Sequence, residues 1–244
     1  MILDNFPKVL WINLERSVDR RRYMENLLNQ YKLSHTRIEA VDGFSIHNKE
    51  YVSCCRRNRS IRNVENACTC SHLKALKFFL EKMDDERIVV FEDDVTFEFL
   101  EYIPFNWSEF EKNLPRDYHV VQLAIFSTTS EVECKLVKWN PQKKYYGTVA
   151  YLMKRVAAEK LLKIYFSERL RMFDLSDKIA LADMAIYSIG HAYSIPIFSY
   201  LANSIIHPSF NNQYMIYKTL QKEVWKKISE DKNFNLKKIF ELLE

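Results

Sequence analysis

Three consecutive carboxylates, Glu92, Asp93 and Asp94, follow a run of β-branched and aromatic residues at positions 88–91. Such a run predicts a buried parallel strand, so the acids are expected at its carboxyl end. Side by side they repel one another unless positive charge lies nearby. Oxygen-only clusters suit Mg²⁺ or Mn²⁺, and ligands of open α/β sheets bind at the carboxyl ends of strands. The sequence therefore predicts a divalent cation that holds a phosphate-bearing substrate; the alternative is an acidic loop paired with arginines.

Glycine is scarce, with three residues in 244, and the chain contains neither a Walker A sequence nor G-x-G-x-x-G. This excludes a glycine-rich phosphate loop, so metal and side chains have to hold any phosphate. The five cysteines, at positions 54, 55, 68, 70 and 134, are odd in number and lack C-x-x-C spacing. Reduced thiols are favoured over zinc ligands or disulfides.

The composition, with 48% hydrophobic and 14% aromatic residues, excludes a disordered chain. The length of 244 residues fits one large α/β domain or at most two small ones. The net charge of +4 is mild; it fits a phosphorylated substrate and gives no support for nucleic acid binding. No apolar run approaches the roughly 20 residues needed to cross a bilayer, and the first residues lack the pattern of a signal peptide. We therefore expect a cytoplasmic protein.

The elements that must position the acids begin with strand, helix and strand at residues 9–14, 18–33 and 36–41, the opening of a nucleotide-binding sheet. Residues 45–66 hold four arginines and few apolar residues. This indicates a surface loop that either clamps an anion or is merely solvated. A helix at 68–82 then leads into the acidic strand, and its His72 is interpreted as structural rather than catalytic.

Beyond the acids, residues 97–114 carry aromatic and acidic residues at helical spacing. An amphipathic helix is expected at 156–166. Further strands are expected at residues 119–126, at 145–153, which could also form a hairpin, and at 192–200, where Pro196 breaks the strand. Gly147 in the second of these strands allows a close approach of the backbone.

The end of the chain differs in kind, because residues 214–228 and 236–243 read as helices with lysine-rich outer faces. We predict a main domain at 1–210 and a helical appendage at 211–244 packed on it. The sequence leaves open whether the appendage makes a peripheral membrane contact or binds a partner. It also leaves the oligomeric state open.

Four sequence blocks occur in a fixed order: INLERSVDRRRYM at 12–24, EAVDG at 39–43, CTCSHLKAL at 68–76 and VVFEDDV at 89–95. Together they resemble glycosyltransferase family 25, which includes bacterial lipooligosaccharide galactosyltransferases and the collagen hydroxylysine galactosyltransferases. Segments 145–162 and 182–204 are similar to later blocks of that family, so the resemblance covers about residues 8–208. Ala67 and Glu15 depart from the family's usual Gly and Asp.

The resemblance implies a GT-A fold, a single Rossmann-like α/β domain with a mostly parallel central sheet and a helical C-terminal extension. It also implies an inverting, metal-dependent transfer of a hexose from a UDP-sugar, with galactose favoured and glucose second. The acceptor is a hydroxyl, such as that of a lipooligosaccharide glycan or of hydroxylysine. Mn²⁺ or Mg²⁺ bridging the diphosphate oxygens offsets the charge that develops on the leaving UDP.

Roles at the reacting centre follow from the same resemblance. Glu92 and Asp94 match the family's D-x-D role as metal ligands, and analogy with other GT-A enzymes adds His207 as a candidate third ligand. Asp93 is expected to face the donor's ribose or sugar, because alternate strand residues point opposite ways. Asp183 is the candidate base for the acceptor hydroxyl; the alternative is that it caps a helix or binds the donor sugar.

Donor binding is expected at the ends of the first two strands and on the helix before the acidic strand. The residues expected to contact the nucleoside or diphosphate are Asn13, Arg16, Asp42, Ser71 and Lys74. Arg20, on the first helix, either reaches the diphosphate or pairs with an acid.

Two other classes of protein compete with a transferase. A metal-dependent phosphodiesterase or nuclease also uses clustered carboxylates, but it normally needs a second acidic or histidine cluster, which the sequence lacks. A catalytically inactive relative would only recognise a glycan or nucleotide, and the intact triplet of acids argues against it.

Overall fold

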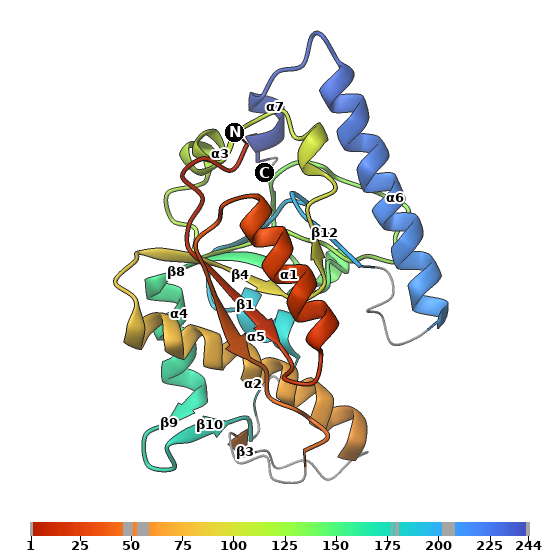
Figure 1. Cartoon of the computed structure of the whole chain (residues 1–244). Helices are drawn as coiled ribbons and strands as arrows, with labels where there is room; N and C mark the ends of the chain where they lie inside the picture. Colours follow the sequence, from red (N-terminus) through yellow and green to blue (C-terminus); the bar gives the residue numbers. More distant parts are fainter. Residues whose placement is uncertain are drawn as a thin grey trace.

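The computed structural model describes residues 2–45, 51–52, 59–176, 178, 181–201 and 208–242. At its centre is a seven-stranded sheet, around which helices pack (Figure 1). The strands of this sheet are β1 (Val9–Asn13), β2 (His35–Glu39), β4 (Arg87–Glu92), β6 (Val120–Gln122), β7 (Val137–Lys138), β8 (Ala150–Lys154) and β11 (Ala192–Ser194). Their order across the sheet is β2-β1-β4-β8-β6-β11-β7.

Most strands of the sheet run in one direction. β1 is parallel to both β2 and β4, and β6 is parallel to β11. β8 lies antiparallel between β4 and β6, so those two strands point the same way, and β7 is antiparallel to β11. β2, β1, β4, β6 and β11 therefore share a direction. This confirms the predicted α/β class with a mostly parallel central sheet.

Alternate side chains along the central strands point to opposite faces of the sheet and build two cores. In β1, Val9 and Trp11 belong to one cluster, whereas Leu10 and Ile12 belong to the other. The helices that pack on the first cluster are α1 (Val18–Gln30), α3 (Trp107–Asn113), α6 (Pro208–Glu230) and α7 (Lys237–Phe240). Those that pack on the second are α2 (Arg59–Lys82), α4 (Arg155–Tyr165) and α5 (Ala182–Tyr187). Burial on both faces explains why the strands read as near-continuous apolar runs.

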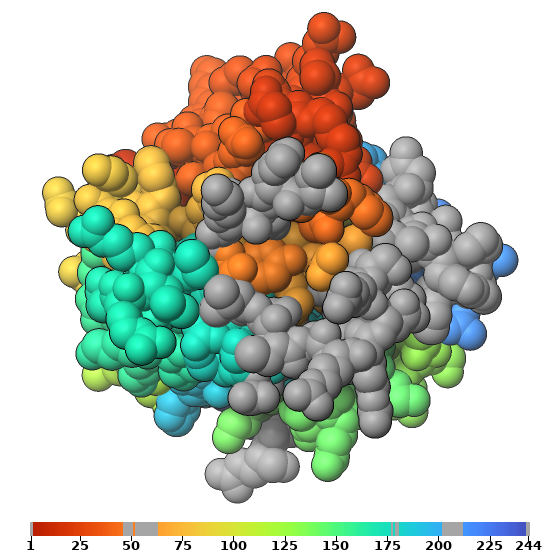
Figure 2. All heavy atoms as spheres, turned by 90° about the horizontal axis from the view of Figure 1, so that it is seen from below, coloured from red at the N-terminus to blue at the C-terminus, as the bar shows by residue number. Residues whose placement is uncertain are grey.

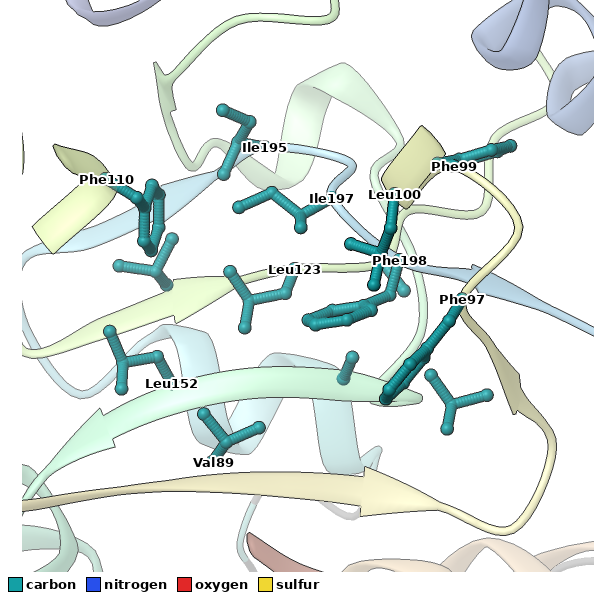
Figure 3. Close-up of a cluster of buried hydrophobic side chains, with 14 of the residues drawn as sticks. Val89, Phe97, Phe99, Leu100, Phe110, Leu123, Leu152, Ile195, Ile197 and Phe198 are labelled. Carbon is teal, nitrogen blue, oxygen red and sulfur yellow. The ribbon is translucent and has the colours of Figure 1, made fainter. Parts of the chain in front are cut away.

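The first core fixes the chain on both sides of the acidic turn. Figure 3 shows Val89 of β4 and Leu152 of β8 on one side of this core and Phe198 on the other. Phe91, Phe97 and Phe198 contact one another with ring centroids 4.8 to 5.6 Å apart. Directly after the acids, β5 (Val95–Thr96) pairs with β12 (Ser199–Tyr200). The turn is therefore held between β4 and a second small sheet.

The C-terminal helices share the first core with the sheet. The Trp225 side chain of α6 is fully buried, and its Nε1 donates a hydrogen bond to the Pro196 carbonyl at 2.6 Å. Ile239 of α7 is also buried there. Lys218 Nζ donates to the Tyr200 carbonyl at 2.8 Å, beside the small sheet. α6 and α7 therefore pack against the chain that supports the acidic turn. None of the described helices is long and apolar enough to span a bilayer.

A first difference from the sequence-based expectation concerns residues 45–66. β3 (Tyr51–Val52) pairs with β10 (Met172–Asp174), which in turn pairs with β9 (Phe166–Ser167), and α2 already begins at Arg59. The prediction of an irregular loop over residues 45–66 is thus wrong for 51–52 and 59–66, and the arginines at 56 and 57 lie outside the described residues. Seen from below, α2 (orange) is exposed between the N-terminal part (red) and α4 with β9 and β10 (teal), as Figure 2 shows.

The second difference concerns residues 97–114. They form a 3₁₀ turn at Leu100–Tyr102 and then α3, with no continuous helix over the stretch. Pro104 lies between the two, and proline disfavours helical geometry in the residue before it. A side-chain and backbone capping box of Asn106 and Glu109 then starts α3.

Candidate functional site

A cavity of about 190 Å³ opens where β1, β2 and β4 end. These three strands are parallel neighbours, so their carboxyl ends meet at one edge of the sheet. One side of α2 and the residues that lead into α1 complete the walls. This is the place where open parallel sheets bind ligands.

Six of the residues predicted to contact donor or metal line this cavity, and they come from four separate segments of the chain. They are Asn13, Arg16, Asp42, Ser71, Glu92 and Asp93. Two further described residues from that set, Lys74 on α2 and Asp94 in the acidic turn, are not among the residues that line the cavity. His207 lies outside the described residues.

Asp93 is clamped by two side chains. It is only 7% exposed; its Oδ2 accepts a hydrogen bond from Asn13 Nδ2 at 2.6 Å, and its Oδ1 accepts one from Arg20 Nη1 at 2.7 Å. Arg20 thus pairs with an acid, which was one of its two predicted roles, and supplies the positive charge expected beside the triplet. The guanidinium also lines the cavity, so it faces any anion bound there.

Asn13 serves as the hub that orients this clamp. Its Nδ2 also donates to the Ser17 carbonyl at 3.1 Å, and its Oδ1 accepts from Arg37 Nε at 3.0 Å. The side chain is 1% exposed, and its amide is engaged on both ends by protein groups. Asn13 therefore positions Asp93, a contribution that its place at the end of a strand did not reveal.

Glu92 is held by residues from two other elements. Thr148 Oγ1 donates to Glu92 Oε1 at 2.6 Å, and His72 Nε2 of α2 lies 3.3 Å from the same oxygen. Burial by itself raises the pKa of Glu92, but the hydrogen bonds from His72 and Thr148 and the nearby charge of Arg20 outweigh it, so the net pKa is lowered. Glu92 therefore presents an ionised carboxylate, a possible cation ligand, at the cavity wall.

His72 and Cys68 lie in the site although the sequence reasoning gave neither a part in it. Both line the cavity, and they are one helical turn apart on α2. His72 is 1% exposed, with Nδ1 3.2 Å from the Tyr151 hydroxyl. The signal that could have found them was their spacing of four residues on a helix that leads directly into the acidic strand.

Asp94 completes the acidic turn after β4, and Asp183 belongs to α5. Asp94 is 6% exposed, and its carbonyl accepts from the Leu201 N–H at 2.7 Å. Asp183, near the start of α5, accepts from the Gly147 N–H through Oδ2 at 3.3 Å. Burial, followed by the charges of Glu92, Asp183 and Asp94, raises the pKa of the Cys68 thiol well above its usual value. The negative charges of three carboxylates therefore act on the Cys68 thiol.

The other predicted donor contacts are engaged within the protein. Arg16 and Asp42 form an ion pair that joins the loop after β1 to the loop after β2. Ser71 Oγ donates to the Ala67 carbonyl at 2.7 Å and accepts from the Val41 N–H at 2.9 Å, which ties α2 to the chain after β2. These contacts define the shape of the cavity wall.

The donor atoms at this edge fit a divalent cation. Carboxylate oxygens, supplied by Glu92, Asp93 and Asp94, are the donors that Mg²⁺ and Mn²⁺ prefer. Asn13 and Arg20 hold Asp93, and Thr148 and His72 hold Glu92 in the same way. Asp94 is not among the residues that line the cavity. Binding of the ion by the pair Glu92 and Asp94 stays a prediction, which the oxygen donors of the acidic turn support.

Two solved structures are similar to this chain at low identity. An inositol-1-phosphate CTP transferase from T. maritima is 15% identical, with a TM-score of 0.39 over 87% of this chain and 77% of that chain. A glycosyltransferase involved in the glycosylation of the major capsid of PBCV-1 is 7% identical, with a TM-score of 0.39 over 86% and 98% of the two chains. The curated protein sequences contain no match.

The sequence itself matches a family model over residues 6–175, more than two thirds of the chain. The family is described as glycosyltransferase family 25 (LPS biosynthesis protein). All residues that line the cavity fall within the matched range, whereas Asp183 lies beyond it. The protein therefore belongs to glycosyltransferase family 25.

Proposed function

We propose that this glycosyltransferase moves a hexose from a UDP-sugar to a hydroxyl acceptor, with inversion and with Mn²⁺ or Mg²⁺ bound at the acidic turn. Galactose is the favoured sugar and glucose the second. A lipooligosaccharide glycan is preferred over hydroxylysine as acceptor, because the family is described by LPS biosynthesis. The observation that carries the proposal is the cavity at the strand ends, where the acids meet two arginines.

The cavity offers both signs of charge that a nucleoside diphosphate and its cation require. Glu92 and Asp94 would hold the cation, which when bound offsets the negative charge on the leaving diphosphate. Arg20 uses one N–H for Asp93 and has further donors for a phosphate oxygen. Arg16 also lines the cavity; its side chain is 53% exposed, so it can leave Asp42 and bind the donor instead.

The acceptor side is assigned to Asp183. Its two carboxylate oxygens accept backbone N–H groups, from Gly147 at 3.3 Å and from Met184 at 2.8 Å, which fix the side chain. A fixed carboxylate at the edge of the site is suited to accept the proton of the attacking hydroxyl. Asp183 lies outside the matched family range, so this role rests on its contact with Gly147 and on the effect of its charge on the Cys68 thiol.

A thermal-shift series tests the nucleotide and metal parts of the proposal. UDP, UDP-galactose and UDP-glucose are each added with and without Mn²⁺, to the wild type and to Asp94→Ala. Ligand at about 100 times its Kd stabilises the fold by about 2.7 kcal/mol. We expect manganese-dependent stabilisation in the wild type and its loss in Asp94→Ala.

The matched control is Asp84→Ala. Asp84 is an exposed carboxylate just before the amino end of β4, the opposite end from the cavity. It should keep the full response. Absence of any nucleotide response in the wild type, or an equal loss in both variants, contradicts the proposed site.

Product analysis tests the reaction. Mass spectrometry after incubation with a panel of glycan and hydroxylysine acceptors should detect a mass gain of one hexose, and Asp183→Asn should abolish it while keeping the UDP response. Free hexose or UMP without a glycosylated product would instead indicate hydrolysis.

A further inference from the structure

A mixed set of sulfur, nitrogen and oxygen donors lies inside the cavity. Cys68 Sγ, a ring nitrogen of His72 and a carboxylate oxygen of Glu92 are all within 4.8 Å of one another. Cys68 and His72 are one turn apart on α2, and Glu92 is the last residue of β4. Two rigid elements therefore present the three groups, and all three line the same cavity, which gives an ion a route of entry.

The spacing is close to that of a tetrahedral metal site. Zinc bonds to nitrogen and oxygen of about 2.0–2.2 Å and to sulfur of about 2.3 Å place neighbouring ligand atoms roughly 3.3–3.7 Å apart. His72 Nε2 and Glu92 Oε1 are already 3.3 Å apart. A change in the Cys68 rotamer or a small shift of its side chain brings the sulfur into range.

The groups behind these donors match those that orient metal ligands. A metal-binding histidine usually donates its other ring N–H to a neighbouring acceptor. Nδ1 of His72 lies 3.2 Å from the Tyr151 hydroxyl, and Nε2 faces Glu92 Oε1 at 3.3 Å, so an ion between them would replace that hydrogen bond. Thr148 Oγ1 fixes the Glu92 carboxylate at 2.6 Å. Tyr151 and Thr148 are both buried, so these contacts do not compete with bulk water.

We propose that Cys68, His72 and Glu92 bind a thiophilic divalent cation, with Zn²⁺ as the natural example and Co²⁺ as its spectroscopic substitute. Three protein ligands leave the fourth position open toward the cavity, for water or an oxygen of a bound phosphate. On binding, the thiol releases its proton to solvent and the thiolate coordinates the ion. The site goes beyond the proposed function, since Mn²⁺ and Mg²⁺ prefer a set of oxygen ligands.

The two metal sites share Glu92. A zinc ion bound to Cys68 and His72 would draw that carboxylate away from the cation of the transferase reaction. We therefore expect Zn²⁺ to inhibit the Mn²⁺-dependent response to UDP, and excess chelator followed by Mn²⁺ to restore it.

Cobalt absorption spectroscopy on the metal-stripped full chain, without nucleotide, tests the site. Thiolate coordination gives a charge-transfer band in the near ultraviolet, and tetrahedral geometry gives intense visible bands. We expect both bands to saturate at one equivalent in the wild type. Cys68→Ser should lose the charge-transfer band, and His72→Gln should weaken Co²⁺ binding by roughly tenfold or more.

Two controls address the other thiols. Cys70→Ser changes a buried thiol two residues along the same helix, in the second core, and should keep the bands. The double variant Cys54→Ser and Cys55→Ser should also keep them. Circular dichroism melts check that each variant folds. If Cys68→Ser does not fold, Tyr151→Phe takes its place, with an expected loss of about tenfold or more in Co²⁺ affinity through His72.

The proposal is overturned if the wild type shows no charge-transfer band, or if the band survives in Cys68→Ser. Neither result bears on the transferase proposal, because no nucleotide or Mn²⁺ is present in this titration. Conversely, if the protein does not respond to UDP, the transferase proposal fails, but the cobalt spectra still test the zinc site.

Discussion

Replacing Gly147 by alanine should destabilise the fold and disturb the acceptor side of the site together. Gly147 has a φ of +94°, which L side chains rarely adopt, and a Cβ at this position would lie 2.7 Å from the Phe126 ring. Its N–H donates to Asp183, and its carbonyl accepts from the Tyr187 hydroxyl at 3.0 Å and from Gln122 Nε2 at 3.0 Å. A shift of this one peptide therefore moves three side chains.

Two effects contribute to the expected cost. Holding a residue other than glycine in this backbone region costs about 1–3 kcal/mol. Forcing a methyl group against a packed ring costs about 1–3 kcal/mol. Gly147→Ala should therefore lower the free energy of unfolding by about 2–6 kcal/mol, a large part of the roughly 5–15 kcal/mol of a typical domain.

Urea denaturation followed by circular dichroism measures this cost, and a double-mutant cycle separates its two parts. Phe126→Ala removes the ring, so in that background Gly147→Ala should cost only the backbone part, about 1–3 kcal/mol. A cost below about 1 kcal/mol in the wild-type background would refute the reasoning about the backbone. An equal cost in both backgrounds would refute the steric part.

Two further predictions concern the C-terminal helices. Trp225→Ala should lower the free energy of unfolding by about 3–5 kcal/mol, because a fully buried indole and its hydrogen bond to Pro196 are lost; a urea midpoint close to that of the wild type would contradict this. Burial by itself raises the pKa of Glu98, but the hydrogen bond and the charge of Lys218 outweigh this effect, so the net pKa lies below 4.5. The Glu98 carboxylate should therefore stabilise the fold above about pH 4.5. This contribution is lost as the pH falls through the lowered pKa. Lys218→Met should flatten this part of the pH profile of unfolding, measured between about pH 3 and pH 6, and an unchanged slope would contradict the assignment.

Local patterns predicted the opening of the fold well. The expected strand, helix and strand at 9–14, 18–33 and 36–41 correspond to β1, α1 and β2, because their apolar periods depend on short stretches of chain. The helix ends earlier than predicted, since Lys32 has a φ of +54°. The acids do follow a buried strand, and the cavity forms at its carboxyl end.

The contacts between distant segments could not be predicted in the same way. Nothing in the sequence near Asn13 indicates that its amide reaches Asp93, 80 positions later, or that Arg20 completes the clamp. The first turns of α2 were also missed, because they carry polar and basic residues that are typical of a loop. Tertiary packing decides such positions, and it overrides local propensity.

The place of β8 between β4 and β6 has a consequence for synthesis on the ribosome. β1, β2 and β4 can pair with one another as soon as residue 92 has emerged, but β6 finds its partners only in β8 and β11, which lie later in the chain. Until β8 is made, β4 presents an unpaired edge to the surroundings. Nascent chains that stop before about residue 150 should therefore hold half a sheet with an open, apolar border, the stage at which a chaperone would be needed most.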